Sequence, residues 1–300
     1  MNFDWLMKLI DTHCHVHFNA YKQDMDEVIR RSLEKGVFLI TVGTQADTSR
    51  RGLEVAERYE GVWATVGLHP SHLCEQSFVD DEEVDPSQTQ IIKTRCEVFD
   101  PKVYLPLAQH SKCVAIGECG LDYYHFPEGC DPEAEKERQR QTCRAHFELA
   151  SKVGLPVVIH SRNAHKEQLG IIKEFLDQNQ LQRRGVIHCF TGTLEEAQAY
   201  LDSGFLISVT GIVTFSPRKK DQLESGLSLL QEVVRQLPLE SLMVETDAPY
   251  ICPEPFRGQR NEPWQVITIA KKIAEIKGIS FEEVAEVTNT NAKRLFGISF

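Results

Sequence analysis

The sequence predicts an α/β protein with the architecture of a (β/α)8 TIM barrel. Short apolar runs alternate with segments of helical periodicity, which is typical of a parallel sheet. There are eight such runs, the number that this barrel requires. The length of 300 residues also fits one such barrel. An open, doubly wound sheet is the alternative, but no Gly-x-Gly-x-x-Gly follows an early strand, which disfavours its dinucleotide-binding version.

The apolar runs are the expected parallel strands. They occupy residues 6–10, 37–43, 62–67, 113–117, 155–159, 185–187, 205–209 and 242–244. Helices are expected at residues 26–34, 47–59, 102–110, 132–153, 165–178, 193–202, 219–236, 262–277 and 280–296. Gly36 follows the first helical segment, where a glycine often ends a helix. Ser280 and Glu283 have the spacing of a capping box at the start of the last segment.

One acidic segment, at about residues 74–101, interrupts this alternation. It is too long for an ordinary connection, so we interpret it as an insertion with one short helix near residues 88–96. A solvated, charged loop is favoured over a lid on the substrate. The sequence therefore predicts a single domain over residues 1–300 that carries this acidic insertion.

Composition and charge limit the possible partners. The net charge of −11 disfavours a general attraction to nucleic acid or to an anionic membrane. An anionic substrate would then need a local positive site, which bound metal ions can supply. The nine cysteines form no Cys-x-x-Cys pair, which indicates reduced thiols and a cytoplasmic location. The N-terminus lacks an apolar run fit for a signal peptide or a membrane span. We expect no membrane association and no obligate protein partner.

Imidazoles and carboxylates recur where the expected strands end. In a barrel these ends lie on the face that carries the chemistry. A lone histidine is usually structural, but six potential ligands at matching positions indicate a shared metal site. His13 and His15 would project to the same side of one strand. The six candidate ligands are His13, His15, Glu118, His160, His188 and Asp247.

These side chains are enough for two divalent cations. We expect His13, His15 and Asp247 at one ion. His160 and His188 are expected at the other. Glu118 would bridge the two, because a carboxylate can span cations about 3.5–4 Å apart. Nitrogen and oxygen ligands suit Zn²⁺ or Mn²⁺, and Mg²⁺ less well.

A pair of cations of this kind can activate a water molecule for hydrolysis. Asp247 could accept the proton of that water, so Asp247 and Glu118 are the candidate catalytic residues. His69 and Arg162 also follow strand ends, and either could contact a substrate phosphate. Structural roles at the rim are the alternative for both.

Seven motifs, taken in order, resemble those of the TatD family of metal-dependent deoxyribonucleases. They run from about residue 8 to residue 297 and are very specific as a set. The motifs are Asp11-Thr12-His13-Cys14-His15, Gly67-Leu68-His69-Pro70, Ile116-Gly117-Glu118-Cys119-Gly120-Leu121-Asp122-Tyr123-Tyr124, His160-Ser161-Arg162, His188-Cys189-Phe190-Thr191-Gly192, Glu245-Thr246-Asp247-Ala248-Pro249 and Arg260-Asn261-Glu262-Pro263.

The resemblance implies a TIM barrel of the metallo-dependent hydrolase superfamily. It also implies a phosphodiesterase that uses Mg²⁺ or Mn²⁺ and removes nucleotides from 3′ ends. By motif, the same six residues look like the metal ligands, and His69 and Arg162 look like contacts to the substrate phosphate. Some branches of the family lack the first His-x-His pair, which is present here. The departure from the family pattern is the long acidic insertion.

Three functions are compatible with these observations. The first is a deoxyribonuclease that acts on DNA ends, a transient nucleic-acid partner. The second is a hydrolase of the same superfamily acting on an aminoacyl ester (D-aminoacyl-tRNA), an amide or a lactone, since the same activated water serves carbonyl centres. Related lactonases and phosphotriesterases usually have a modified lysine at the bridge, so Glu118 favours the TatD branch. The third is a catalytically silent binding module, which the intact ligand set disfavours.

Overall fold

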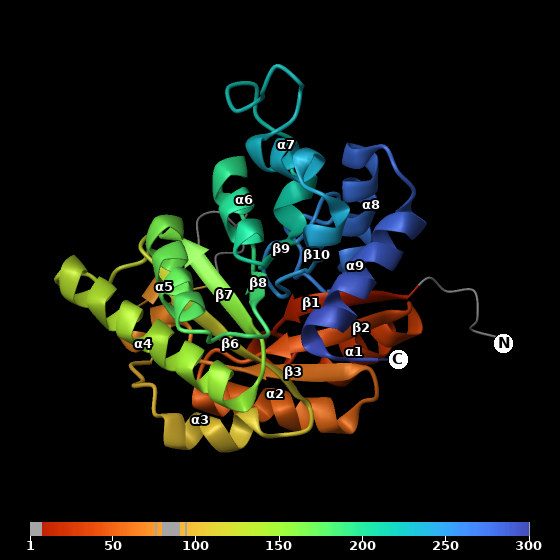
Figure 1. The fold of residues 1–300 in the computed structure, drawn as a ribbon. Coiled ribbons are helices and arrows are strands. Elements are labelled where there is room, and N and C mark those ends of the chain that lie inside the picture. The colour runs from red at the N-terminus through yellow and green to blue at the C-terminus, as the bar shows by residue number, and fades with distance from the viewer. Residues whose placement is uncertain (1–7, 76, 80–90, 94, 300) are drawn as a thin grey trace. The chain divides into compact units, whose positions relative to one another are not determined.

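The computed structural model describes residues 8–75, 77–79, 91–93 and 95–299 (Figure 1). Its main sheet has eight strands in the order β1-β2-β3-β6-β7-β8-β9-β10. The strands are β1 Leu9–Cys14, β2 Val37–Val42, β3 Val62–Val66, β6 Cys113–Asp122, β7 Val157–Arg162, β8 Gly185–Ile187, β9 Leu206–Val209 and β10 Leu242–Val244. Eight parallel strands that alternate with helices confirm the predicted (β/α)8-barrel class.

Nine α-helices lie in the described part of the chain. They are α1 Met25–Glu34, α2 Ala46–Arg58, α3 Pro101–Ala108, α4 Pro132–Val153, α5 His165–Asp177, α6 Leu194–Asp202, α7 Leu229–Gln236, α8 Val266–Lys277 and α9 Phe281–Phe296. The expected cap of the last helix is present, because the Ser280 hydroxyl accepts from the backbone N–H of Glu283 at 3.1 Å. Among these described helices, none is long and apolar enough to cross a membrane.

The chain divides into two compact units. Unit 1 comprises residues 1–40, 189–202 and 206–300, and unit 2 comprises residues 41–188 and 203–205. The single domain over residues 1–300 therefore remains a prediction.

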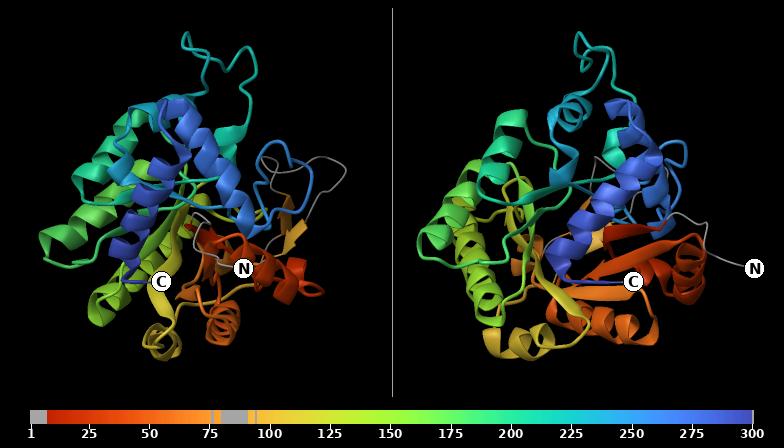
Figure 2. Two further views of the ribbon diagram at one scale, coloured as in Figure 1. Left: turned by 90° about the vertical axis from the view of Figure 1, so that its right-hand side faces the viewer. Right: turned by 45° about the vertical axis from the view of Figure 1, so that its right-hand side comes forward.

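In unit 1, the first and last strands of the sheet order meet. Cys14, at the end of β1, forms a parallel bridge with Ala248, which follows β10. α8 and α9 pack side by side, and α9 contacts both strands (Figures 1 and 2, blue). This connects residues from opposite ends of the chain, so the segment after β10 lies beside the end of β1.

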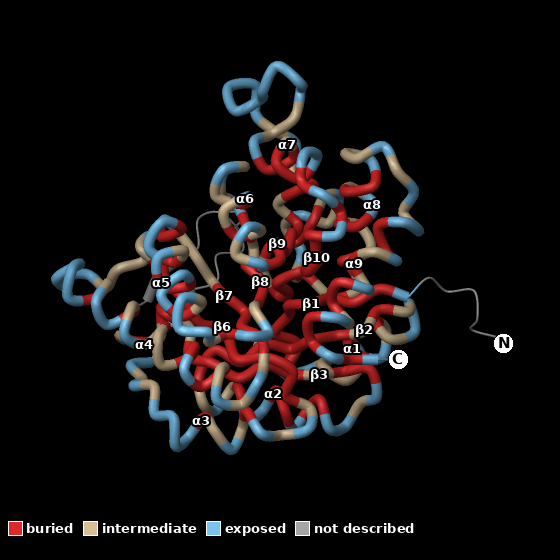
Figure 3. The backbone as a smooth tube through the Cα atoms, viewed as in Figure 1, coloured by how far each residue is buried: buried red, intermediate tan, exposed pale blue. Residues whose placement is uncertain are grey.

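In unit 2, β3, β6, β7 and β8 pair in parallel. α4 packs along β6 and α5 along β7 (Figure 1, yellow and green). The strands are buried and the outward sides of the helices are exposed (Figure 3). The core strands therefore hold the residues at their carboxyl ends in fixed positions.

Two expected helices differ most from the structure. The helix predicted at 219–236 begins only at Leu229, because Ser228 and Gln231 form a capping box there. Gly226 just before it has a φ of 83°, which a helix cannot continue through.

The short helix predicted near residues 88–96 is wrong where the structure describes it. Residues 91–93 form strand β5, Ile91–Lys93, which pairs antiparallel with β4, Ser77–Val79. Residues 95–100 have no regular structure, and 88–90 and 94 lie outside the described residues, as do 6 and 7 of the first expected strand.

Candidate metal centre

Three of the predicted ligands form a first cluster in unit 1: His13, His15 and Asp247. His13 lies in β1, His15 follows that strand, and Asp247 follows β10. The two Nε2 atoms of the histidines lie 3.3 Å apart. Oδ1 of Asp247 lies 3.6 Å from Nε2 of His13 and 3.2 Å from Nε2 of His15. All three side chains are buried, and their potential ligand atoms converge within 4.8 Å of one another.

Backbone hydrogen bonds between β1 and the segment after β10 set this geometry. The N–H of Asp247 donates to the carbonyl of His13 at 2.8 Å, and the N–H of His15 donates to the carbonyl of Ala248 at 2.7 Å. Asp247 itself has a φ of 56°, a left-handed conformation that is unusual for a residue other than glycine. Strained backbone of this kind tends to occur at functional sites, where the surrounding contacts maintain it.

Asp11 also fixes the segment after β10, through hydrogen bonds to Thr246. Its carboxylate accepts from the backbone N–H of Thr246 at 2.8 Å and from the Thr246 hydroxyl at 2.5 Å. Asp11 is fully buried, and burial raises its pKa well above the ordinary value. Asn261 adds a second anchor by donating to the Thr246 carbonyl at 3.0 Å. Asp11 and Asn261 therefore position Asp247 through its neighbour.

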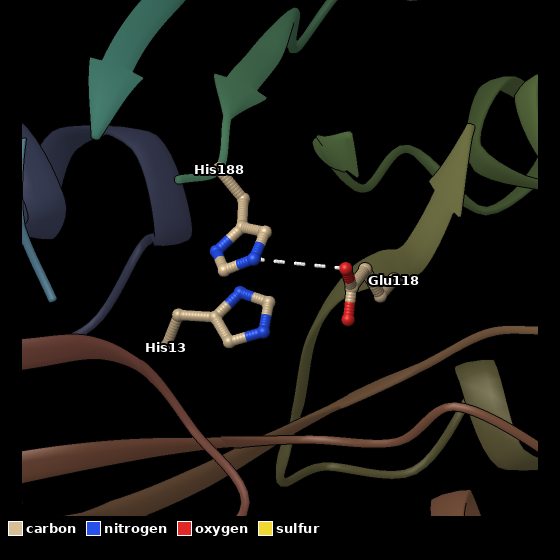
Figure 4. A group of neighbouring side chains, drawn as sticks. All are labelled: His13, Glu118 and His188. Carbon is tan, nitrogen blue, oxygen red and sulfur yellow. Dashed lines mark ion pairs between the residues drawn. The ribbon is translucent and has the colours of Figure 1, made fainter. Parts of the chain in front are cut away.

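The remaining predicted ligands form a second cluster in unit 2: Glu118, His160 and His188, with His69 beside them. Oε1 of Glu118 is the common point. It lies 3.3 Å from Nδ1 of His160, 3.3 Å from Nε2 of His69 and 3.7 Å from Nε2 of His188. Figure 4 shows the pair of Glu118 and His188. His188 directly follows β8, whereas His160 lies within β7.

Glu118 lies in β6, at an irregularity in its pairing with β7. Two nearby glycines leave no room for side chains: a Cβ on Gly117 would lie 2.4 Å from the Val158 carbonyl oxygen, and one on Gly120 2.0 Å from that of His160. Both glycines also have positive φ, 143° and 133°. The N–H of Glu118 donates to the Gly43 carbonyl at 3.1 Å. The irregularity thus fixes the direction of the Glu118 side chain.

Asp122 orients His160 within the second cluster. Its Oδ2 lies 3.2 Å from Nε2 of His160 and 2.9 Å from Nδ1 of His125. Burial opposes ionisation of Asp122, but these two histidines hold its pKa well below the ordinary value. Burial likewise opposes protonation of His160, yet Asp122 and Glu118 raise its pKa to about 9. With Nε2 bound to Asp122, His160 presents Nδ1 to the cluster, as metal-binding histidines held by a carboxylate do.

His69 differs from the other histidines of the second cluster in the ring nitrogen that carries its proton. Its Nδ1 accepts from the backbone N–H of Ser71 at 3.1 Å. Burial lowers the pKa of His69, so the neutral ring carries its proton on Nε2. His69 therefore offers an N–H rather than a lone pair, which suits a hydrogen bond to a substrate oxygen better than a bond to a metal ion.

Arg162 lies two residues after His160 in β7 and so projects to the same side of that strand. Its guanidinium carbon lies 4.2 Å from the centre of the Tyr124 ring. Tyr124 is half exposed. Arg162 therefore lies at the edge of the second cluster, next to an accessible aromatic ring.

Sequence reasoning missed the carboxylates that support the ligands. Asp11 and Asp122 lie inside the motifs noted above, and Glu245 begins another. Oε1 of Glu245 accepts from the backbone N–H of Cys189 at 2.6 Å, which fixes the turn after His188. These carboxylates lie in the same short motifs as the ligands, and this closeness in sequence is the signal that could have identified them.

The donor set of both clusters fits divalent cations. Imidazole nitrogens and carboxylate oxygens are ligands of Zn²⁺, Mn²⁺ and, through the oxygens, Mg²⁺. Groups of three such atoms within 4.8 Å of one another occur in each unit: a buried one of His13, His15 and Asp247, and a partly buried one of His69, Glu118 and His160. A carboxylate next to each set of imidazoles also supplies the negative charge that a cation requires.

The comparisons with known proteins agree with this chemistry. The family of TatD-related DNases matches residues 10–297. A relative from Bacillus subtilis, named an uncharacterized metal-dependent hydrolase (YabD), is 37% identical over 97% of this chain and 100% of its own. A relative from Citrobacter koseri, named the 3′-5′ ssDNA/RNA exonuclease TatD, is 34% identical over 97% of this chain and 100% of its own. The crystal structure of YjjV, a TatD homologue from Escherichia coli K12, has a TM-score of 0.78 and 30% identity, covering 98% of this chain and 100% of that one.

Proposed function

The chain belongs to the family of TatD-related DNases and is a metal-dependent hydrolase, and from this premise we propose that it is a deoxyribonuclease that trims DNA from 3′ ends. The observation that carries the proposal is the pair of histidine and carboxylate clusters in a member of this family. The name of the Citrobacter koseri relative, a 3′-5′ exonuclease, supports the direction of cleavage. A cytoplasmic location remains a prediction from the cysteine pattern.

We assign the metal ligands cluster by cluster. His13, His15 and Asp247 would hold one cation. Glu118, His160 and His188 would hold another. Mg²⁺ and Mn²⁺ are the proposed ions, with Zn²⁺ as the alternative. A cation held by such groups attracts a phosphate and lowers the pKa of a coordinated water. The bridging role of Glu118 remains a prediction.

The chain's own groups bind and orient the substrate. The Nε2–H of His69 donates a hydrogen bond to a phosphate oxygen. The Arg162 guanidinium is suited to bind a second oxygen, since it presents several donors in one plane. Asp247 accepts the proton of the attacking water with one carboxylate oxygen. Only the last few nucleotides need to be held, so a chain with a net charge of −11 can still act on DNA.

The test is an assay on single-stranded DNA labelled at its 5′ end, with Mg²⁺, Mn²⁺ or Zn²⁺ and with a chelator. We expect stepwise shortening from the 3′ end that the chelator abolishes. Glu118→Ala should lower the rate by at least about 100-fold, because it removes the central ligand. Glu137→Gln, an exposed carboxylate on α4, is the matched control and should retain full activity. Full nuclease activity of Glu118→Ala would refute the assignment.

The second candidate is a hydrolase of carbonyl esters, such as D-aminoacyl-tRNA, or of amides and lactones. The relatives named only as metal-dependent hydrolases leave the substrate class open. The same preparation is therefore offered RNA and D-aminoacyl-tRNA. Metal-dependent release of the amino acid without any shortening of DNA would replace the first candidate by the second.

A further inference from the structure

Two cysteines lie at the base of the strand pair β4–β5. The pair is antiparallel, with Ser77 opposite Lys93. Cys74 lies three residues before Ser77, the start of β4, and Cys96 lies three residues after Lys93, the end of β5. The two cysteines thus lie on the two chain segments that leave the strand pair, at equal distances along the chain from it. A disulfide needs Cβ atoms about 3.5–4.5 Å apart, so the closeness of these two segments at the cysteines is what matters.

Contacts beside the cysteines show independently that the two segments stay adjacent there. The Cys96 thiol donates to the carbonyl oxygen of Leu73 at 3.1 Å. The backbone N–H of Glu97 donates to the carbonyl of His72 at 2.9 Å. Leu73 directly precedes Cys74 in the chain, so these two bonds place the Cys96 sulfur beside the backbone of Cys74.

The Cys74 sulfur is flanked by a base and a cation. Its thiol donates to Oε2 of Glu135 at 3.0 Å, and Nη1 of Arg138 lies 2.7 Å from the sulfur. Both groups come from α4, and Glu135 is buried. The same Arg138 nitrogen reaches the Leu73 carbonyl oxygen at 3.4 Å, the oxygen that accepts from Cys96. The two thiols therefore border one network of polar contacts.

The two thiols differ in accessibility. Cys96 is exposed and Cys74 is partly buried. Burial and the hydrogen bond to Glu135 raise the pKa of Cys74 to about 11, and the neighbouring Cys96 adds to the shift. An oxidant therefore meets Cys96 first, while Cys74 keeps its proton until a base removes it.

We propose that Cys74 and Cys96 are an oxidation site of this protein, at which a peroxide joins the two thiols in a disulfide. Hydrogen peroxide transfers one oxygen to Cys96, giving a sulfenic acid and one water. The Cys74 sulfur then attacks the Cys96 sulfur while its proton passes to Glu135. Hydroxide leaves Cys96 and takes up that proton as a second water. The two thiols lose two electrons in all, and the peroxide gains them. Nothing in this step requires the proposed nuclease activity.

The test uses the full-length, folded protein treated with hydrogen peroxide and then with N-ethylmaleimide. We expect a peptide containing Cys74 joined to one containing Cys96, lighter than the two reduced peptides by two hydrogen atoms, which dithiothreitol separates. Cys96→Ser should abolish the link, and Cys130→Ser, at a partly exposed thiol elsewhere in unit 2, should leave its yield unchanged. The link should also raise the Tm of the wild type, by roughly 5 °C, because it closes a loop in the unfolded chain.

Two further variants test the chemistry. Glu135→Gln should slow disulfide closure roughly tenfold, without slowing the first oxidation of Cys96, because the amide cannot accept the proton. Arg138→Met, at an exposed side chain, should also slow closure, and it leaves the buried Glu135 in place. The proposal is overturned if Cys96 proceeds to a sulfinic acid while Cys74 still reacts with maleimide. It is also overturned if protein unfolded in urea gives the link as fast as folded protein.

Discussion

Single hydrogen bonds decide what each histidine of the second cluster can do. His160 is held at Nε2 by Asp122 and presents Nδ1, whereas His69 is held at Nδ1 by Ser71 and presents an N–H. The two imidazoles approach the same oxygen of Glu118 through different nitrogens, Nε2 of His69 and Nδ1 of His160. In the proposed function, this difference separates a metal ligand from a substrate contact.

The first prediction at this scale concerns Asp122. Asp122→Asn should weaken Mn²⁺ binding by about 10–100-fold, because an amide no longer holds His160 as a charged acceptor does. Isothermal titration of the metal-free protein measures the change. Asp131→Asn is the control, since Asp131 is exposed and asparagine also caps a helix such as α4. Equal affinity in Asp122→Asn and Asp131→Asn would contradict the orienting role.

The second prediction concerns His146, a buried residue of α4 outside both clusters. Its Nδ1 donates to the carbonyl of Thr142 at 2.8 Å, and its Nε2 accepts from the N–H of Leu68 at 2.9 Å, next to His69. Burial lowers the pKa of His146 to about 4. The unfolded chain gains this proton near pH 6.5 and the folded chain only near pH 4. The free energy of unfolding therefore falls as the pH drops through this window.

Urea unfolding of metal-free protein at about pH 7 and about pH 5 measures the effect. The wild type should lose roughly 2 kcal/mol more than His146→Gln between these conditions, because glutamine accepts the Leu68 hydrogen bond without titrating. An equal loss in both proteins would show that His146 is not the group responsible.

At the scale of elements, β3 and β6 approach so closely that a glycine is required. A Cβ on Gly67, just after β3, would lie 2.5 Å from the carbonyl carbon of Gly117 and 2.6 Å from the carbonyl oxygen of Glu118. Both of these atoms belong to the backbone, which cannot move away as a flexible side chain could. Glu118 therefore keeps its place only while residue 67 has no side chain.

Gly67→Ala should lower the free energy of unfolding by about 1–3 kcal/mol, as overpacking does, and should lower activity with it. Gly170→Ala is the matched control: Gly170 is exposed in α5 with open space around it. Alanine there should gain roughly 0.5–1 kcal/mol, because glycine disfavours a helix. Urea unfolding of both variants measures the difference, and a fully stable Gly67→Ala would disprove the close packing.

The elements also show where sequence patterns suffice. α4 begins at Pro132 and ends at Val153, as predicted, because Asp131 caps its start and Gly154 has the left-handed φ of 70° that ends it. These signals are local, so the sequence reveals them. The pairing of β4 with β5 is not local, and the sequence predicted a helix where β5 lies.

At the scale of the whole molecule, the first cluster brings together residues that are far apart in the sequence. His13 and Asp247 lie near opposite ends of the sequence, yet the backbone of Asp247 donates to that of His13 at 2.8 Å. A cation held there binds only the folded chain. By mass action it should stabilise the fold by about 2.7 kcal/mol at 100 times its Kd.

The Tm of metal-free protein should accordingly rise by several degrees when Mn²⁺ is added, and fall again with chelator. Asp247→Asn should lose much of this gain, whereas Asp202→Asn, an exposed aspartate of α6, should keep it. A Tm that is indifferent to metal would argue against binding at these residues.

The sequence by itself determined the fold class and the order of the eight main-sheet strands and the helices between them, since both follow from the spacing of apolar residues and from capping residues along the chain. It also determined the candidate ligands, since His13, His15, Glu118, His160, His188 and Asp247 each follow or end a predicted strand. Each of these signals spans only a few residues, so it can be recognised in the local sequence.

Only the tertiary structure decided how Asp11, Asp122 and Glu245 hold the ligand segments, and which nitrogen of His69 carries the proton. The physical reason is distance along the chain. A hydrogen bond between Asp11 and Thr246 depends on strands pairing across more than two hundred residues, and no spacing within either segment encodes that partner.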